Sequence, residues 1–91
     1  MSVKVMALVW DAYRPNVDQK LALLAIADWS DDDGKCFFSE TELASRVRID
    51  TKAMRSVLEA LRADGTLSPL PKHPGWHRLA LDRLSVPRRK R

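Results

Sequence analysis

The longest apolar run of the chain predicts its central helix. Leu21–Ala27 is apolar without a break, and Asn16–Gln19 directly before it has the residue types of a helix capping box. We therefore expect a helix from Val17 to about Trp29. A helix that is apolar nearly all round has to be covered on several sides, so this helix should lie at the centre of the core.

Two further helices are expected, joined by a tight connection at residues 48–50. Ser39–Glu42 has the form of a second capping box and opens a short helix that turns Leu43, Ala44 and Val47 inward. Asp50 then caps a helix from Thr51 to about Ala63. Apolar residues recur along this helix at positions i, i+3, i+4 and i+7, the spacing of one helical face. They are Met54, Val57, Leu58 and Leu61.

Gly65 ends this helix, as a left-handed C-terminal glycine commonly does, and the period of the pattern then changes. Thr66–Leu70 and Trp76–Leu81 are strand-like, and Pro71–Gly75 between them has the residue types of a turn, which predicts a β-hairpin with a basic tip. Cys36–Phe38 is a short strand by the same criteria.

The start of the chain, Val3–Tyr13, has apolar residues at helical spacing and ends before Arg14-Pro15, because proline disfavours helical geometry in the preceding residue. We expect a helix here. We also expect the three tryptophans, Trp10, Trp29 and Trp76, to pack in the core and on the hairpin rather than to stack on nucleic-acid bases.

Length and composition place the chain among single-domain proteins. It has 91 residues and a mass of 10.4 kDa, and its longest apolar run is far shorter than the roughly 20 residues that cross a bilayer. The first residues lack the features of a signal peptide, and a lone Cys36 cannot form an intramolecular disulfide. We expect a cytoplasmic protein with no membrane partner.

Positive charge is concentrated in the second part of the chain. Residues 1–33 carry a net charge of −3 and residues 34–91 a net charge of +7, within a total of +4. A basic segment of this kind indicates a polyanionic partner. Its last residues, 86–91, are expected to form a flexible basic tail behind a domain spanning residues 1–85.

Residues Ser39–Leu61 resemble a helix-turn-helix unit of the winged kind, with Leu43 and the small Ala44 at the helix crossing. The wider stretch Gln19–Leu67 is similar to winged helix-turn-helix domains of phage and plasmid replication proteins and related regulators. The resemblance implies a mainly α fold with a small β-hairpin wing. It also implies binding to double-stranded DNA, in the regulation of transcription or of replication initiation in a phage, plasmid or bacterium.

One position departs from that pattern, because Arg48 stands where the turn usually has glycine. If the last helix of the unit enters a major groove, its outward residues should meet the DNA. Lys52, Arg55 and Ser56 are then expected at base edges or phosphates. Phosphate contacts are expected from Arg48 and Thr51 beside that helix and, on the wing, from Lys72 and Arg78, with His73 and His77 as further wing candidates.

Other functions compete with this interpretation. The outward face of the helix is also what a merely solvated helix would show, and the acidic segment Asp28–Asp33 favours an adaptor that docks a host or replisome protein. A homodimer would need an interface, which exposed Val3, Met6 or Trp10 could supply. No catalytic arrangement and no glycine-rich phosphate loop are present. Cys36, His73 and His77 could suggest a zinc site, but a fourth ligand is missing, and Cys36 lies on an apolar strand where a buried thiol is expected. Neither an enzyme nor a cofactor is expected.

Overall fold

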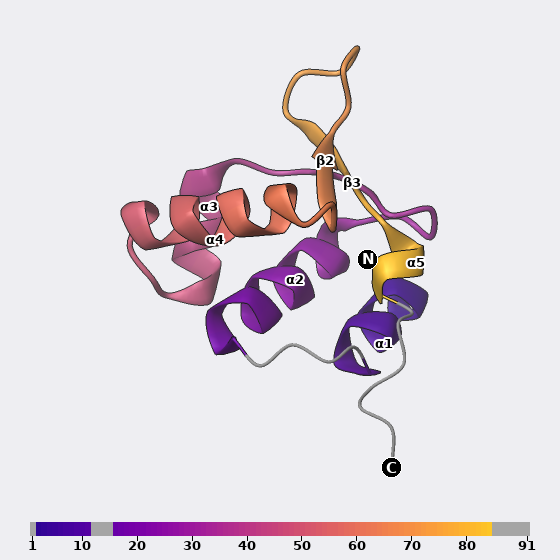
Figure 1. Cartoon of the computed structure of the whole chain (residues 1–91), viewed down its shortest axis with the longest axis horizontal. Coiled ribbons are helices and arrows are strands. Elements are labelled where there is room, and N and C mark those ends of the chain that lie inside the picture. Colours follow the sequence, from indigo (N-terminus) through magenta and orange to yellow (C-terminus); the bar gives the residue numbers. More distant parts are fainter. Residues whose placement is uncertain (1, 12–15, 85–91) are drawn as a thin grey trace.

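The computed structural model describes residues 2–11 and 16–84, which form five helices and three short strands (Figure 1). In chain order they are α1 (Val3–Asp11), α2 (Val17–Trp29), β1 (Lys35–Phe37), α3 (Glu40–Val47), α4 (Thr51–Ala63), β2 (Leu67–Pro69), β3 (Trp76–Leu79) and α5 (Leu81–Leu84). The predicted fold class, mainly α with a small β-hairpin wing, is confirmed. None of these helices is both long and apolar enough to span a lipid bilayer.

Helix α2 is the central helix, as predicted, and its bounds are those expected. The Asn16 side chain accepts a hydrogen bond from the Gln19 N–H at 3.0 Å, which caps the helix. Leu23 and Ile26 are fully buried, and α2 contacts α1, α3, α4 and β1. Leu21 nevertheless stays 43% exposed, so one side of the apolar run is not covered within the described residues.

The turn between α3 and α4 contains Arg48 in the left-handed conformation, at the position where such turns usually have glycine. Arg48 has φ 70° and ψ 42°, a conformation that costs a side-chain-bearing residue about 1–2 kcal/mol. The turn is kept because the N–H groups of Arg48 and Ile49 both donate to the Ala44 carbonyl, at 2.8 and 3.1 Å. Ala44 itself is 2% exposed, and its small side chain permits the close approach of the helices.

Helix α4 follows its predicted pattern. The Asp50 carboxylate accepts from the Ala53 N–H at 2.7 Å and caps the helix, and Gly65 just beyond its end has φ 84°. The four apolar residues expected to point inward are buried, namely Met54, Val57, Leu58 and Leu61. One face of α4 is therefore fixed against the core and the opposite face is directed to solvent.

The sheet is larger than the predicted hairpin, because β1 joins it. The strand order is β1-β3-β2 and both pairings are antiparallel. Cys36 and His77 pair across β1 and β3 on the face that packs against the helices, where both are buried. The wing projects beyond the helices on the extension of β2 and β3 (Figure 1).

The segment after the sheet differs from the prediction. The strand expected to reach Leu81 ends at Leu79, and the short helix α5 occupies Leu81–Leu84, where no helix was expected. Leu84 is 1% exposed and α5 contacts α1, so burial of this leucine accounts for the helix. The predicted basic tail at 86–91 lies outside the described residues, as do residues 12 and 13 of the expected first helix.

Candidate nucleic-acid interface

Five of the seven predicted DNA-contacting residues lie together at the start of α4. Thr51, Lys52, Arg55 and Ser56 are exposed on its first two turns, and Arg48 is exposed in the turn before it. The inward face of α4 is packed into the core, so the backbone that carries these side chains is held in place. We call this set of five residues the α4 surface.

Arg55 in the α4 surface is not an isolated cation. Its Nε lies 3.4 Å from Oε1 of Glu40, at the first turn of α3, and the two side chains are 62% and 35% exposed. An ion pair this exposed contributes little to stability. Arg55 can therefore leave Glu40 for another acceptor at a small cost in free energy. In the absence of another acceptor, Glu40 holds the Arg55 guanidinium beside the first turn of α3.

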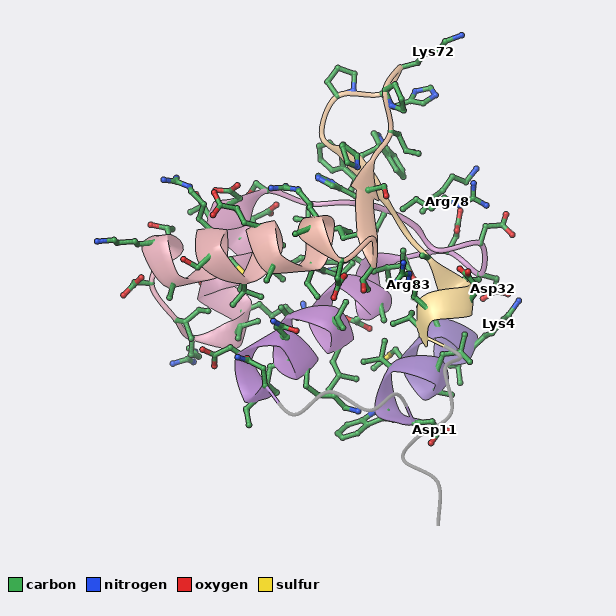
Figure 2. All side chains as sticks on the ribbon, in the orientation of Figure 1. Lys4, Asp11, Asp32, Lys72, Arg78 and Arg83 are labelled. Carbon is green, nitrogen blue, oxygen red and sulfur yellow. The ribbon has the colours of Figure 1, made fainter. Side chains whose placement is uncertain are left out.

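The other two residues of the predicted site lie on the wing and not on α4. Lys72 is exposed at the tip of the wing (Figure 2). Arg78 pairs with Lys35 on β1 and Ser68 on β2, on the sheet face opposite to the one that packs on the helices. In Figure 2 it extends from the side of the wing that faces away from α4.

His77 is not available to phosphates, and that part of the wing expectation is wrong. The ring is only 9% exposed, stacks on Phe38 with centroids 4.6 Å apart, and places Nε2 3.2 Å from Nη2 of Arg62. Since arginine only donates, Nε2 accepts and the ring is neutral. Burial, followed by the Arg62 charge, lowers the pKa of His77 from its usual 6.5, against opposing contributions from the Gly75 backbone and the Glu40 carboxylate.

This geometry predicts a loss of stability in mild acid. A histidine whose pKa is lower in the folded than in the unfolded chain takes up its proton preferentially in the unfolded state. The free energy of unfolding should therefore be constant near pH 8 and fall as the pH drops below the usual 6.5 of His77. Urea unfolding of the wild type between pH 8 and pH 5.5 measures this.

The variant His77→Gln keeps an acceptor for Arg62 and removes the titrating ring, so its stability should change much less over the same pH interval. His73→Gln is the matched control, because His73 is exposed on the wing and its loss should leave the wild-type pH profile intact. Equal pH profiles for the wild type and His77→Gln would show that another group is responsible.

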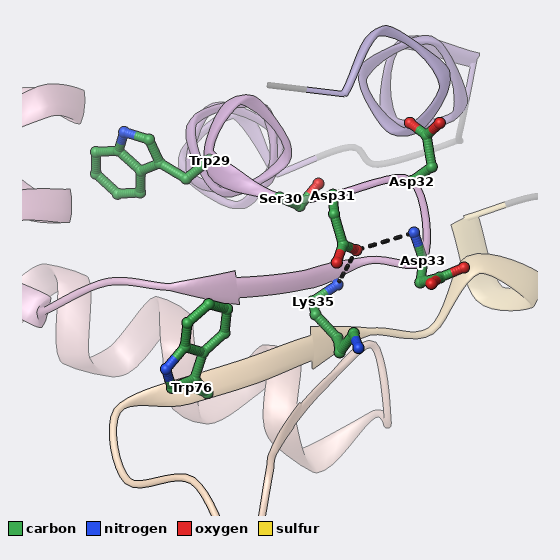
Figure 3. A pocket seen from close by; sticks show the side chains of 7 residues that line it. All are labelled: Trp29, Ser30, Asp31, Asp32, Asp33, Lys35 and Trp76. Atoms are coloured by element: carbon green, nitrogen blue, oxygen red, sulfur yellow. Dashed lines mark hydrogen bonds between the residues drawn. The ribbon is translucent and has the colours of Figure 1, made fainter.

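The acidic segment Asp28–Asp33 is largely engaged within the protein. Asp28 pairs with Arg46 at 2.6 Å, and Asp32 accepts from the Ser2 hydroxyl at 2.7 Å. The Asp31 carboxylate accepts from the N–H groups of Asp33 and Lys35, at 2.9 and 3.0 Å (Figure 3). These carboxylates thus have structural roles, which weakens the argument for an acidic docking surface.

The three tryptophans do not all lie where they were expected. Trp29 is half-buried against the core, with Phe38 6.5 Å and the Arg46 guanidinium 5.3 Å from its ring. Trp10 is 60% exposed, so its placement in the core was wrong. Trp76 lies on the hairpin as expected but remains 41% exposed.

Cysteine and metal chemistry find no support in the described part of the chain. Cys36 is buried, and burial, with the Asp31 charge, raises the pKa of its thiol to about 12. The thiol is therefore protonated at neutral pH and unreactive. Among residues 2–11 and 16–84, no group of three or more histidine, cysteine or acidic side chains is placed to hold a metal ion.

No family model, curated protein or solved structure matches this chain. A functional assignment therefore has to come from the residues of the chain and their geometry.

Proposed function

We propose that the protein is a winged helix-turn-helix domain that binds double-stranded DNA with α4 in the major groove. In the cell it would act in the cytoplasm to regulate transcription or replication initiation in a phage, plasmid or bacterium. The observation that carries the proposal is the α4 surface. Lys52 and Arg55 project there from a helix whose other face is fixed in the core, and Arg48 projects from the turn before it.

The geometry of α4 suits this role. The major groove of B-DNA is about 12 Å wide and admits one helix, and the α4 surface lies at the N-terminal end that such helices direct to base edges. Lys52 and Arg55 are three residues apart and so share one side of the helix. Each can donate to guanine O6 and N7 or to a phosphate, and Ser56 next to them can donate or accept.

The remaining groups set limits on how the duplex can lie. Lys72 at the wing tip would contact a phosphate beyond the groove. Glu59 is exposed two turns along α4 from Lys52 and would repel phosphate, so it has to accept from a cytosine amino group or face away from the backbone. Arg78 lies on the other side of the wing and is not part of this interface.

Affinity for a duplex should depend steeply on salt. Each phosphate neutralised by a lysine or arginine contributes about 0.9 to the slope of log affinity against log salt, so three such contacts give a slope near −2.7. Fluorescence anisotropy with a labelled duplex between low and moderate salt measures this slope. In a duplex library, Arg55→Ala should relax sequence preference, whereas Lys72→Ala should weaken binding evenly across sequences.

A flat salt dependence, or sequence preference that follows Lys72 instead of Arg55, would contradict the proposal.

The second candidate function is a protein-docking adaptor, favoured by apolar side chains left exposed on α1 and α2. Val3, Trp10, Val17 and Leu21 are 72%, 60%, 67% and 43% exposed. The same surface would serve a homodimer, which sedimentation of the free protein tests.

A further inference from the structure

The face of the sheet that points away from the helices carries two aromatic rings and two cations. Phe37 on β1 pairs with Trp76 on β3, and their ring centroids are 5.6 Å apart. Lys35 pairs with Arg78 two residues further along the same strands, and so on the same face of the sheet. We call these four residues the outer sheet surface.

Folding alone does not explain the outer sheet surface. Phe37 is 56% and Trp76 is 41% exposed, so much of both rings gains nothing from burial. Like charges directly opposite each other on neighbouring strands are destabilising, yet Lys35 and Arg78 stand in that relation. Within the described residues neither cation has an ion-pair partner.

The aromatic pair is held in place by the turn of the wing. Gly75 has φ 83°, and a Cβ atom at this position would lie 2.6 Å from Cε1 of Phe37. Only glycine therefore lets the Phe37 ring lie against the turn. Trp76 also lines a hollow together with Lys35, Leu70, His73 and Asp31.

Each edge of the sheet is partly blocked against pairing with another strand, which favours a ligand that lies on the face of the sheet. On the β1 edge, the Lys35 N–H donates to the Asp31 carboxylate and the Lys35 carbonyl accepts the Asp31 N–H. On the other edge, Pro69 of β2 has no N–H to offer. Pairing with an extended peptide or with β1 of a second copy is thereby disfavoured.

We propose that the outer sheet surface binds single-stranded DNA, with an unstacked base against Trp76 and Phe37 and neighbouring phosphates at Lys35 and Arg78. Exposed aromatic rings bind bases of any sequence through their faces, and cations beside them follow the backbone. An intact duplex hides its base faces in the stack, so only a single strand can use both halves of this surface.

Charge favours this occupant over a protein. Both cations are unpartnered among the described residues. Three aspartates, Asp31, Asp32 and Asp33, line a hollow beside Lys35 and Trp76. Two of them are engaged within the protein, since Asp31 accepts two backbone N–H bonds at 2.9 and 3.0 Å and Asp32 accepts from the Ser2 hydroxyl. In Figure 3, Lys35 and Trp76 lie on the same side of the sheet, beside that loop. The proposal does not depend on duplex binding, because Trp76 and Arg78 lie on a different face from the α4 surface.

The test is anisotropy of a labelled oligothymidylate, titrated with the full chain, in parallel with a duplex. Trp76→Leu keeps an apolar contact to Phe37 but removes the stacking face, and should weaken oligothymidylate binding about tenfold, within the range measured for base stacking. Lys35→Gln together with Arg78→Gln should make the slope of log affinity against log salt shallower by about 1.4, since each contact on a single strand contributes about 0.7.

Matched controls separate this surface from the rest of the molecule. Trp10→Leu removes a ring from α1 that is 60% exposed, more than the 41% of Trp76. Lys52→Gln with Arg55→Gln removes two charges from the α4 surface. Both should leave oligothymidylate binding within twofold of wild type. Unchanged urea midpoints in all variants would show that the fold is kept.

Wild-type affinity in Trp76→Leu would overturn the proposal, as would equal losses in the control variants or failure of the wild type to bind oligothymidylate at low salt. Tighter binding to RNA of matched sequence than to DNA would also overturn the assignment to DNA. If Lys52→Gln with Arg55→Gln loses duplex binding but keeps oligothymidylate binding, the single-strand proposal is supported. If this variant keeps duplex binding, only the proposed function of the α4 surface is contradicted.

Discussion

Replacing Arg48, Lys52 and Arg55 together by glutamine is expected to weaken binding to duplex DNA by about two to three orders of magnitude at 0.1 M salt. Each phosphate contact contributes about 0.9 to the slope of log affinity against log salt. Because 0.1 M salt lies one log unit below 1 M, each contact strengthens binding at 0.1 M by about 0.9 log units relative to binding at 1 M. The phosphate contacts of Arg48 and Lys52 then sum to about 1.8 log units. Loss of a guanine contact of Arg55, worth about 1–3 kcal/mol, adds about one log unit more. Anisotropy titrations of a labelled duplex measure the loss directly.

The matched control removes three positive charges from the other side of the molecule. Lys4, Lys35 and Arg78 are exposed, and Figure 2 shows Lys4 and Arg78 on the side away from α4. Their replacement by glutamine should reduce duplex affinity less than about tenfold, through the general field of the protein alone. Equal losses in the two triple variants would show that net charge, and not the α4 surface, governs binding.

The same substitutions should leave the fold intact. Lys52 and Arg55 are exposed residues away from caps and buried networks, and substitutions at such positions usually change stability by less than about 0.5 kcal/mol. Arg55 loses only its exposed contact to Glu40, and glutamine at position 48 occupies the left-handed turn much as arginine does. Unfolding midpoints close to wild type are therefore a condition for interpreting the loss of affinity.

Gly34→Ala is expected to destabilise the fold by about 2–4 kcal/mol, the range in which a strained backbone and a steric conflict add together. Gly34 has φ 88°, and a Cβ atom there would lie 2.7 Å from the Leu79 carbonyl oxygen. That oxygen belongs to the backbone and cannot turn aside as a side chain would. Relief requires β1 and β3 to separate where the Leu79 N–H donates to the Gly34 carbonyl at 2.8 Å.

Gly65→Ala provides the matched control for backbone conformation. Gly65 has a similar φ of 84°, but its added Cβ would meet only the Arg83 guanidinium at 3.5 Å, an ordinary contact. This variant should lose about 1 kcal/mol, the penalty for left-handed geometry alone. Urea unfolding of both variants measures the difference, and equal losses would contradict the steric conflict at Leu79.

The two proposed nucleic-acid surfaces lie on different faces and so can be tested separately. The α4 surface is part of the helical layer, and the outer sheet surface lies on the far side of β1 and β3. A variant confined to one should change one ligand and spare the other. A duplex with a single-stranded extension offers both ligands at once, and its binding relative to the two separate ligands measures whether one molecule of protein uses both.

The α-helical part of the fold was predictable from the sequence because its signals are local. Asn16 and Asp50 cap α2 and α4 through bonds to residues three positions on, and the buried face of α4 follows from helical spacing. The exposed α4 surface was identified by the same reasoning, since the residues opposite a buried face must point outward.

Contacts between distant segments were beyond such reasoning. The pairing of β1 with β3 joins residues about 40 positions apart, and no short pattern records it. That pairing buries His77, exposes Trp76 and sets Arg78 beside Lys35 instead of beside α4. The burial of Leu84 against the core is likewise a long-range contact, and it accompanies the helix α5, which no sequence pattern predicted.

The sequence by itself determined the three helices α2, α3 and α4 and which side of α4 is charged, because capping and periodicity act over a few residues. Only the tertiary structure decided which side chains of the wing face solvent and which neighbours they have. The side of a strand that is buried depends on which strands and helices it meets, and short strands such as β1 and β3 carry too few residues to specify those partners alone.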